Sequence, residues 1–316
     1  MVASCGTVTG AAEALHYTPS AVSAQLRTLA RELGVELVVQ DGRRLRLTPA
    51  ARTLLGHVDE LFSRWEEIRA DVAISGDESG GSLRLCGFST AAAALLPQVA
   101  ARLGVERPGC RVTIIEADPK ECFDLLLADQ ADVAVVVATG DVPPSADARF
   151  EQRHLLEDPL DLLLPVSHRL AARADVALGE LADDPWIMDR PGRPYHQLLV
   201  TACAAAGFTP TEAHYAAEWD TGAALVAAGL GVALIPRLAH LPMGYPIARL
   251  PLVGESAPTR HILTGVRAGS SGHPVVAAAL GALTDLAASH DETAPEPPAP
   301  VEGSPAPLLP ACRGRQ

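Results

Sequence analysis

Hydroxyl-bearing, small and arginine side chains gather in one short stretch near the start of the chain. Between residues 16 and 34, an apolar stripe of Val22, Leu26, Leu29 and Leu33 predicts a helix with one buried face. The outward face and the cap before it hold Thr18, Pro19, Ser20, Ser23, Ala24 and Arg27. Small side chains let a helix approach a partner closely, and hydroxyl and guanidinium groups bond base edges and phosphates in a DNA groove. We therefore predict that these residues bind DNA.

The elements around this helix favour the same chemistry. Thr18 is a suitable N-cap, Pro19 suits the first helical position and Gly34 suits the C-terminal end. Thr7 precedes a second short helix at residues 8–15, which leaves only a tight turn between the two helices. This spacing is typical of a helix-turn-helix.

A basic hairpin is predicted directly after the second helix. Residues 35–39 and 44–47 alternate in hydropathy around Asp41 and Gly42, and Arg43 and Arg44 stand at the tip. Arginines at such a position can reach phosphates or a narrow minor groove. A capped amphipathic helix within an ordinary helical bundle is the alternative, but it does not account for the turn and the basic hairpin together.

The charge is distributed unevenly along the chain. The 316 residues carry a net charge of −13, which argues against indiscriminate nucleic-acid binding by the whole protein. Residues 1–57 hold six arginines and four acidic residues, so this first part is mildly basic and the rest is strongly acidic. We expect DNA to bind only the first part.

A long helix follows, with an apolar seam. Residues 48–74 contain only Pro49 and Gly56 as helix-breaking residues. The apolar residues are spaced alternately by four and three positions: Leu54, Val58, Leu61, Trp65, Ile68 and Val72. Such a heptad seam favours dimerisation through a second copy of the helix, and packing against the chain's own body is the alternative.

The remainder of the chain alternates between strands and helices. We predict strands at 83–88, 111–116, 133–137, 162–165 and 232–235, and helices at 91–103, 119–127, 195–206 and 221–228. Uninterrupted apolar strands such as residues 133–137 suit sheets covered on both faces. Two α/β lobes with a cleft between them follow from this order.

Hydroxyl and acidic side chains begin one helix in each lobe. Ser89 and Thr90 end the first strand of the body, and Asp220 and Thr221 begin a helix of the other lobe. We predict that these four residues bind an effector, either a small acid held by the helix N-termini or, given Asp220, an amine or hydroxyl-bearing molecule. Helix capping without a ligand is the alternative for each of them.

The sequence offers little support for an enzyme, a metal site or a membrane protein. Motifs of serine hydrolases, zinc proteases, P-loops and dinucleotide-binding folds are absent, and the histidines are dispersed. The six cysteines form no CxxC pair, so we expect reduced structural thiols. We predict no catalytic residue, no cofactor, no metal, no membrane span and a cytoplasmic location.

Several motifs make the chain resemble the LysR-type transcriptional regulators. The motifs are AAEAL at 11–15, TPSAVS at 18–23, DGRRLRLTPA at 41–50, GSLRL at 81–85, LADDPWI at 181–187 and AAGLGVALIP at 227–236. The resemblance implies a winged helix-turn-helix, a dimerising linker helix and an effector domain of the periplasmic-binding-protein type, with the ligand between its lobes. Family members carry a longer first helix, so we expect this helix to be truncated here.

We therefore predict a mixed α and α/β protein with five parts. These are a winged helix-turn-helix at 1–52, a linker helix at 53–75, a hinge linker at 76–82, a two-lobed effector domain at 83–289 and a disordered tail at 290–316. Lobe 1 comprises about 83–158 and 265–289, and lobe 2 about 159–264. The expected partners are promoter DNA, a small-molecule effector, one or three further copies of the chain, and RNA polymerase. A two-lobed binding protein with a non-functional DNA-binding segment is the alternative function.

Overall fold

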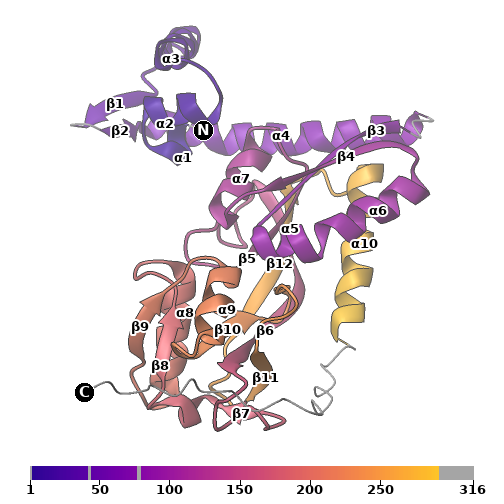
Figure 1. Cartoon of the computed structure of the whole chain (residues 1–316). Helices are drawn as coiled ribbons and strands as arrows, with labels where there is room; N and C mark the ends of the chain where they lie inside the picture. The colour runs from indigo at the N-terminus through magenta and orange to yellow at the C-terminus, as the bar shows by residue number, and fades with distance from the viewer. Residues whose placement is uncertain (1, 42–43, 77–79, 292–316) are drawn as a thin grey trace, which may run out of the picture.

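The computed structural model describes residues 2–41, 44–76 and 80–291. A small N-terminal unit lies at one end of a long helix, and two lobes follow on the other side of that helix (Figure 1). This arrangement confirms the predicted order of a helix-turn-helix, a linker helix and a two-lobed α/β domain.

The N-terminal unit consists of short helices and a two-stranded wing. Its elements are α1 (Val2–Cys5), α2 (Val8–Ala14), α3 (Pro19–Leu33), β1 (Val38–Asp41) and β2 (Arg44–Leu47). Thr7 caps α2 by accepting a hydrogen bond from the Gly10 N–H (3.0 Å), and Thr18 caps α3 by accepting one from the Ala21 N–H (3.2 Å). The small core of the unit contains Ala11, Ala12 and Val22.

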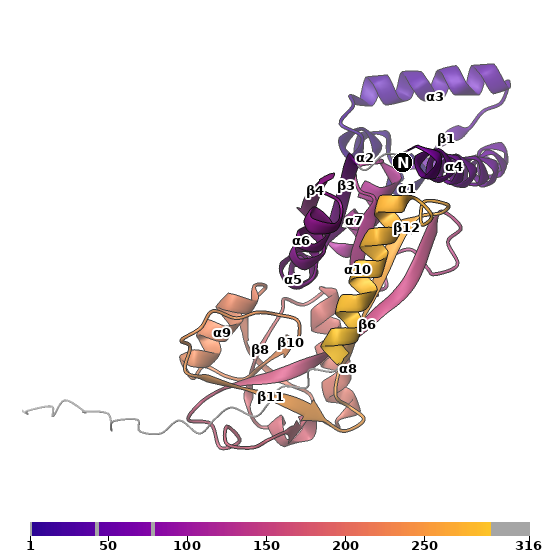
Figure 2. The same cartoon turned by 90° about the vertical axis from the view of Figure 1, so that its right-hand side faces the viewer.

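Two details of this unit differ from the prediction. The apolar stripe of α3 is buried only at Val22, whereas Leu29 and Leu33 are 40% and 46% exposed. They are exposed because α3 extends beyond α2, its main neighbour in the unit, as Figure 2 shows. The wing begins at Val38 and not at residue 35, and residues 42 and 43 of its tip lie outside the described residues.

The linker helix α4 (Pro49–Ser75) is the longest helix of the described chain. Thr48 caps it by accepting a hydrogen bond from the Ala51 N–H (3.1 Å), and Pro49 occupies the first turn, where an N–H has no helical partner. The helix therefore begins inside the segment that we predicted as the DNA-binding domain. Residues 77–79 of the predicted hinge linker lie outside the described residues, and Gly80 already belongs to the next strand.

Lobe 1 is a mixed sheet covered by helices. Its elements are β3 (Gly80–Gly87), α5 (Ser89–Ala94), α6 (Leu96–Glu106), β4 (Gly109–Glu116), α7 (Pro119–Leu127), β5 (Val133–Val137), the first part of β6 (Phe150–Pro165), β12 (Thr259–Arg267) and α10 (Pro274–Asp291). Strands β4, β3 and β5 run parallel, and β12 pairs antiparallel with β5 and β6. Helix α10 packs along α6 at the side of this sheet (Figure 2).

Lobe 2 uses the far end of β6 and the remaining elements. These are β7 (Val176–Ala177), a 3₁₀ turn (Leu178–Leu181), β8 (Pro185–Met188), α8 (Pro194–Ala205), β9 (Thr211–Tyr215), α9 (Trp219–Ala227), β10 (Ala233–Pro236) and β11 (Ile247–Val253). Strands β10 and β11 pair antiparallel with β6, and β8 pairs parallel with β9. Trp186 and Leu199 lie in the core of this lobe, both fully buried.

The two lobes are joined by two strands of one shared sheet. Strand β6 runs from lobe 1 into lobe 2, and β12 brings the chain back, with Thr259 opposite Pro159. The chain was predicted to return from lobe 2 to lobe 1 between residues 264 and 265. This boundary is too late, because residues 262–265 of β12 already pair with β5 of lobe 1. The pairing is long-range, so local hydropathy contains no signal for it.

Two element predictions in the body also need correction. The helix predicted at 91–103 is in fact two helices, α5 and α6. Pro97 has no N–H to donate a hydrogen bond to a preceding helical turn, and it occupies the first turn of α6 instead. The strand predicted at 162–165 is only the end of the 16-residue β6. Within the described residues, no helix combines the length and the apolar character that a membrane span requires. Most of the predicted tail, residues 292–316, lies outside the described residues.

Candidate functional site

The outer face of α3 presents the residues that we predicted to bind DNA. Thr18, Pro19, Ser20, Ala24 and Arg27 are exposed, and Ser23 is half-buried. The hydroxyl oxygens of Thr18 and Ser20 lie 3.0 Å apart, so these side chains form one small polar surface at the helix N-terminus. Figure 1 shows α3 at the end of the molecule farthest from the lobes, where a large partner has access to it.

The wing follows α3 in the chain and contacts α4 through β2. Its two strands pair in register, with Asp41 opposite Arg44 and Val39 opposite Arg46. The Arg46 side chain is exposed, whereas Arg43, a predicted phosphate contact, lies outside the described residues. Arg44 is placed at the first position of β2, next to the tip. The unit therefore offers a helix face and a basic hairpin to the same partner.

The predicted seam of α4 is exposed towards its end nearest the lobes. Leu61 is 67% exposed, Trp65 54% and Val72 65%. Leu54 and Val58, nearer the wing, are half-buried, and Ile68 is 39% exposed. In the described chain, therefore, most of this seam has no intramolecular cover.

The opposite face of α4 is fixed to lobe 1 by charged groups. The buried Glu66 carboxylate accepts a hydrogen bond from Nε of Arg267 (2.8 Å), at the end of β12. Arg267 also donates to the carbonyl oxygens of Leu126 and Ala131 (3.0 and 2.7 Å). A Cβ added at Gly269 would clash with the Ser63 carbonyl oxygen, so the backbone of lobe 1 touches the helix directly.

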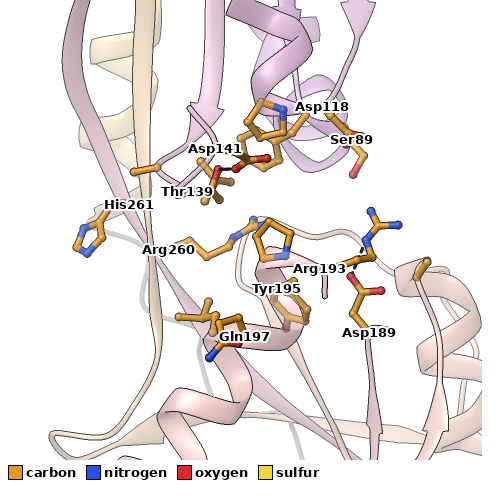
Figure 3. A pocket seen from close by; sticks show the side chains of 18 of the residues that line it. Ser89, Asp118, Thr139, Asp141, Asp189, Arg193, Tyr195, Gln197, Arg260 and His261 are labelled. Atoms are coloured by element: carbon orange, nitrogen blue, oxygen red, sulfur yellow. Dashed lines mark hydrogen bonds and ion pairs between the residues drawn. The ribbon is translucent and has the colours of Figure 1, made fainter. Parts of the chain in front are cut away.

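A cleft of about 1000 Å³ lies between the two lobes. Figure 3 shows side chains from both lobes pointing into it. Five carboxylates line the cleft, from Glu116, Asp118, Asp141, Asp189 and Glu218, against the guanidinium groups of Arg193 and Arg260. The lining of the cleft therefore carries an excess of negative charge.

The lobe 1 wall comes from loops that follow parallel strands. Ser89 follows β3, Asp118 follows β4, and Thr139 and Asp141 follow β5. These side chains meet because the carboxyl ends of parallel strands share one edge of the sheet. Thr139 donates a hydrogen bond to Asp141 (2.6 Å), whereas Asp118 caps α7 without a side-chain hydrogen bond to it.

The lobe 2 wall centres on the loop between β8 and α8. The buried Asp189 carboxylate pairs with Nε of Arg193 at 3.0 Å, and Arg193 points across the cleft towards Ser89 (Figure 3). Tyr195 donates its hydroxyl to the Leu234 carbonyl oxygen (2.9 Å) and packs edge-on against Trp219. Burial raises the pKa of Tyr195 far above its usual range, so this hydroxyl stays protonated.

The floor of the cleft is formed where β6 and β12 pass from one lobe to the other. Arg260 on β12 is buried, donates from Nε to Asp158 on β6 (3.2 Å) and lies over the Phe88 ring (5.1 Å). Asp158 also accepts a hydrogen bond from the Leu238 N–H (3.0 Å). These contacts join the backbone of Leu238 in lobe 2 to both of the strands that connect the lobes.

The four residues predicted for the effector occupy different places. Ser89 lines the cleft, and the buried Thr90 lies beneath it, with its hydroxyl 3.5 Å from Arg260. Asp220 and Thr221 lie outside the lining, and the Asp220 carboxylate accepts a hydrogen bond from the Tyr245 hydroxyl (2.9 Å). Helix α9 begins at Trp219, two residues earlier than predicted. Glu218 and Trp219 therefore line the cleft in place of Asp220 and Thr221.

Sequence reasoning overlooked the β8–α8 loop. Neither Arg193 nor Asp189 is among the residues predicted from the sequence to bind an effector. Both follow β8, which pairs parallel with β9, so they lie at a carboxyl strand end, like the residues of the lobe 1 wall. Arg260 offered no comparable signal, since its partner Asp158 is brought to it only by the pairing of β6 with β12.

Comparisons with known proteins agree with this architecture. The chain matches the family model described as bacterial regulatory helix-turn-helix protein, lysR family, over residues 1–52, and the LysR substrate binding domain over residues 76–288. A probable hydrogen peroxide-inducible genes activator from Mycobacterium avium is 30% identical over 79% of this chain and 78% of its own length. The transcriptional dual regulator GltC from Bacillus subtilis is 28% identical over 69% of this chain and 71% of its own.

Solved structures share the fold. Full-length OxyR from Pseudomonas aeruginosa aligns with a TM-score of 0.60 at 23% identity, covering 90% of this chain and 93% of that one. The BenM effector binding domain with benzoate aligns with a TM-score of 0.58 at 19% identity over 68% of this chain and 95% of that one.

The chain belongs to the LysR family of transcriptional regulators. It is a DNA-binding regulator of transcription whose second part is an effector-binding domain of two α/β lobes.

Proposed function

We propose that this regulator reads operator DNA with α3 and its wing, and that a small molecule held between the lobes changes that binding. The observation that carries the proposal is the joint presence of an exposed polar helix face and a cleft lined by charged groups in one chain. Effector binding would shift the population towards one angle between the lobes and so alter the spacing of two DNA-binding units.

The DNA contacts that we propose are those predicted from the sequence. Thr18, Pro19, Ser20, Ser23, Ala24 and Arg27 would lie in the major groove, and Arg43 and Arg44 would reach the backbone or the minor groove from the wing. We propose a winged helix-turn-helix that ends at Thr48, where α4 begins.

We further propose that two chains associate through the exposed seam of α4. A monomer would leave Leu61, Trp65 and Val72 in water, whereas a second copy of the helix would bury them. Two related DNA-binding units would then suit a palindromic operator.

The effector that we propose is a small polar molecule with a positively charged or hydrogen-bond-donating group. Carboxylates outnumber guanidinium groups in the cleft, and Asp189 already neutralises Arg193 in part. Asp118 and Asp141 would receive the donating group, while Ser89 and Arg193, which face each other across the cleft, would hold an acceptor on the same molecule.

A series of four-carbon probes tests this charge preference. We would measure the Tm of the full chain with 1,4-diaminobutane, 4-aminobutanoate and succinate, which share a length and differ in charge. The two amines are expected to raise Tm by mass action, and Asp118→Asn is expected to reduce that rise. Asp183→Asn is the matched control, since Asp183 is exposed in lobe 2 and does not line the cleft. A rise with succinate alone would refute the preference.

A further inference from the structure

Three side chains with metal-ligating atoms meet on the outer face of the strands that join the lobes. They are His154 and Glu157 of β6 and His261 of β12. Nε2 of His154 lies 3.2 Å from the Glu157 carboxylate oxygen Oε1, and Nδ1 of His261 lies 2.8 Å from the same oxygen. One ligand atom from each of the three residues lies within 4.8 Å of the other two.

A β-bulge brings the three side chains to one face. Glu157 pairs with His261 and Leu156 with Ile262, but the next pair is His154 with Leu263, so Leu155 has no partner in this register. In a regular strand, residues three apart point to opposite faces. The extra residue reverses this alternation, and His154 therefore lies on the same face as Glu157 and His261.

We propose that His154, Glu157 and His261 form a binding site for Zn²⁺. Imidazole nitrogen and carboxylate oxygen are ligands that Zn²⁺ prefers, and three protein ligands leave a fourth position for water. Ligands at about 2.0–2.1 Å in a tetrahedron lie about 3.3 Å apart, so the two histidines need only small movements to bind one ion together with the carboxylate.

The position of the site gives the ion a role. The ligands come from both strands that connect the lobes, immediately before Asp158 on β6 and after Arg260 on β12. His261 borders the cleft, but its ring points away from the Arg260 side chain (Figure 3), so the ion would lie at the edge of the cleft and away from Arg260. Bound Zn²⁺ would fasten the two strands together beside the point where the lobes bend.

The sequence did not predict this site. We expected no metal because the histidines are dispersed and none is followed by another at a helical spacing. His154 and His261 are brought together only by the long-range pairing of β6 with β12, and the bulge that orients His154 has no marker in the sequence.

Titration of the untagged full chain with Zn²⁺ tests the proposal, followed by calorimetry and by the visible absorption of Co²⁺ as a substitute ion. We expect one ion per chain, and we expect His154→Ala or His261→Ala to weaken binding by about 100-fold, because changes even to outer partners of a ligand cost about 10- to 100-fold. Zn²⁺ should also raise the Tm of the unaltered chain and leave the Tm of both variants unchanged.

A matched control is available on the linker helix. His57 and Glu60 form an exposed pair with the same spacing in the sequence as His154 and Glu157, but without a second histidine. The His57→Ala variant should bind Zn²⁺ like the unaltered chain. Absence of Zn²⁺ binding by the full chain, or equal binding by all four proteins, would overturn the proposal and leave the cluster as exposed hydrogen-bonded pairs.

Discussion

At the residue scale, three thiols of the body lie in environments that disfavour oxidation. Cys86, Cys122 and Cys203 are fully buried. Burial raises the pKa of Cys203 to about 11, and a hydrogen bond with Cys122, together with burial, raises the pKa of Cys86. Since the thiolate is the reactive form, these cysteines have little reactivity at neutral pH. The M. avium relative is named a probable activator of hydrogen peroxide-inducible genes, but the environments of these three thiols do not suit a peroxide sensor.

We predict that hydrogen peroxide leaves these thiols intact in the native protein. With a pKa of about 11, only about one Cys203 thiol in 10⁴ is ionised at pH 7. Mass spectrometry after brief peroxide treatment should find Cys86, Cys122 and Cys203 unmodified, and modification should follow only in denaturant. Rapid oxidation of any of the three in the folded chain would show that this account of their environment is wrong.

A second residue-scale prediction concerns Asp132, which joins two arginines in lobe 1. Although burial acts to raise its pKa, hydrogen bonds from Arg84 lower the pKa below the ordinary value. A lowered pKa in the folded state stabilises the protein above the unfolded pKa of 3.8, and this stabilisation is lost as the pH falls through the folded value.

Asp132→Asn should therefore destabilise the chain at pH 7 by about 2–4 kcal/mol, because two arginines lose a buried charged partner. The difference between the variant and the unaltered chain should shrink below about pH 4, where Asp132 itself becomes protonated. Denaturant unfolding at pH 7, 5 and 3 measures this difference in the free energy of unfolding. A difference that does not vary with pH would contradict the ionised state of Asp132.

At the element scale, the sequence predicted best those features that are encoded locally. The caps Thr7 and Thr18 and the stop at Gly34 fall where they were expected, since each depends on neighbouring backbone groups. Helix α7 and strand β5 match their predicted limits. The pairing of β6 with β12 and the bulge at Leu155 could not be predicted, because they depend on segments that are distant in the sequence. For the same reason only part of the cleft lining, Ser89, was identified in advance.

The exposed seam of α4 yields a prediction about assembly. Replacing Leu61 and Trp65 together by aspartate should convert a dimer into a monomer, because two facing seams would then bring like charges together. Sedimentation measures the mass of the assembly. Val105→Asp is the control, since Val105 is an apolar residue on α6 that is 81% exposed and lies outside the seam. A dimer that survives the double change would place the interface elsewhere.

At the scale of the whole molecule, one strand spans the distance from the cleft to the linker helix. Strand β12 begins beside Arg260 in the cleft floor and ends at Arg267, which holds the buried Glu66 of α4. The direct contact of Gly269 with α4 adds a second attachment at the same end. A change in the angle between the lobes thus has a short physical route to the helix that carries the DNA-binding unit.

The central claim is that α3 reads DNA, and fluorescence anisotropy tests it most directly. We would titrate labelled DNA from the region upstream of the chain's own reading frame with the unaltered protein, with Arg27→Ala and with Arg111→Ala. Arg111 is an exposed arginine on β4, far from α3, and serves as the control. We would repeat each titration at several salt concentrations, because phosphate contacts make affinity depend on salt.

We predict that Arg27→Ala weakens binding by about tenfold, within the roughly 1–3 kcal/mol that a good base contact provides, and that Arg111→Ala binds like the unaltered chain. Equal binding by Arg27→Ala and the unaltered chain would contradict the assignment of α3 as the reading helix. Absence of binding by the unaltered chain to this DNA, and to random DNA at low salt, would contradict the claim as a whole and favour a two-lobed binding protein.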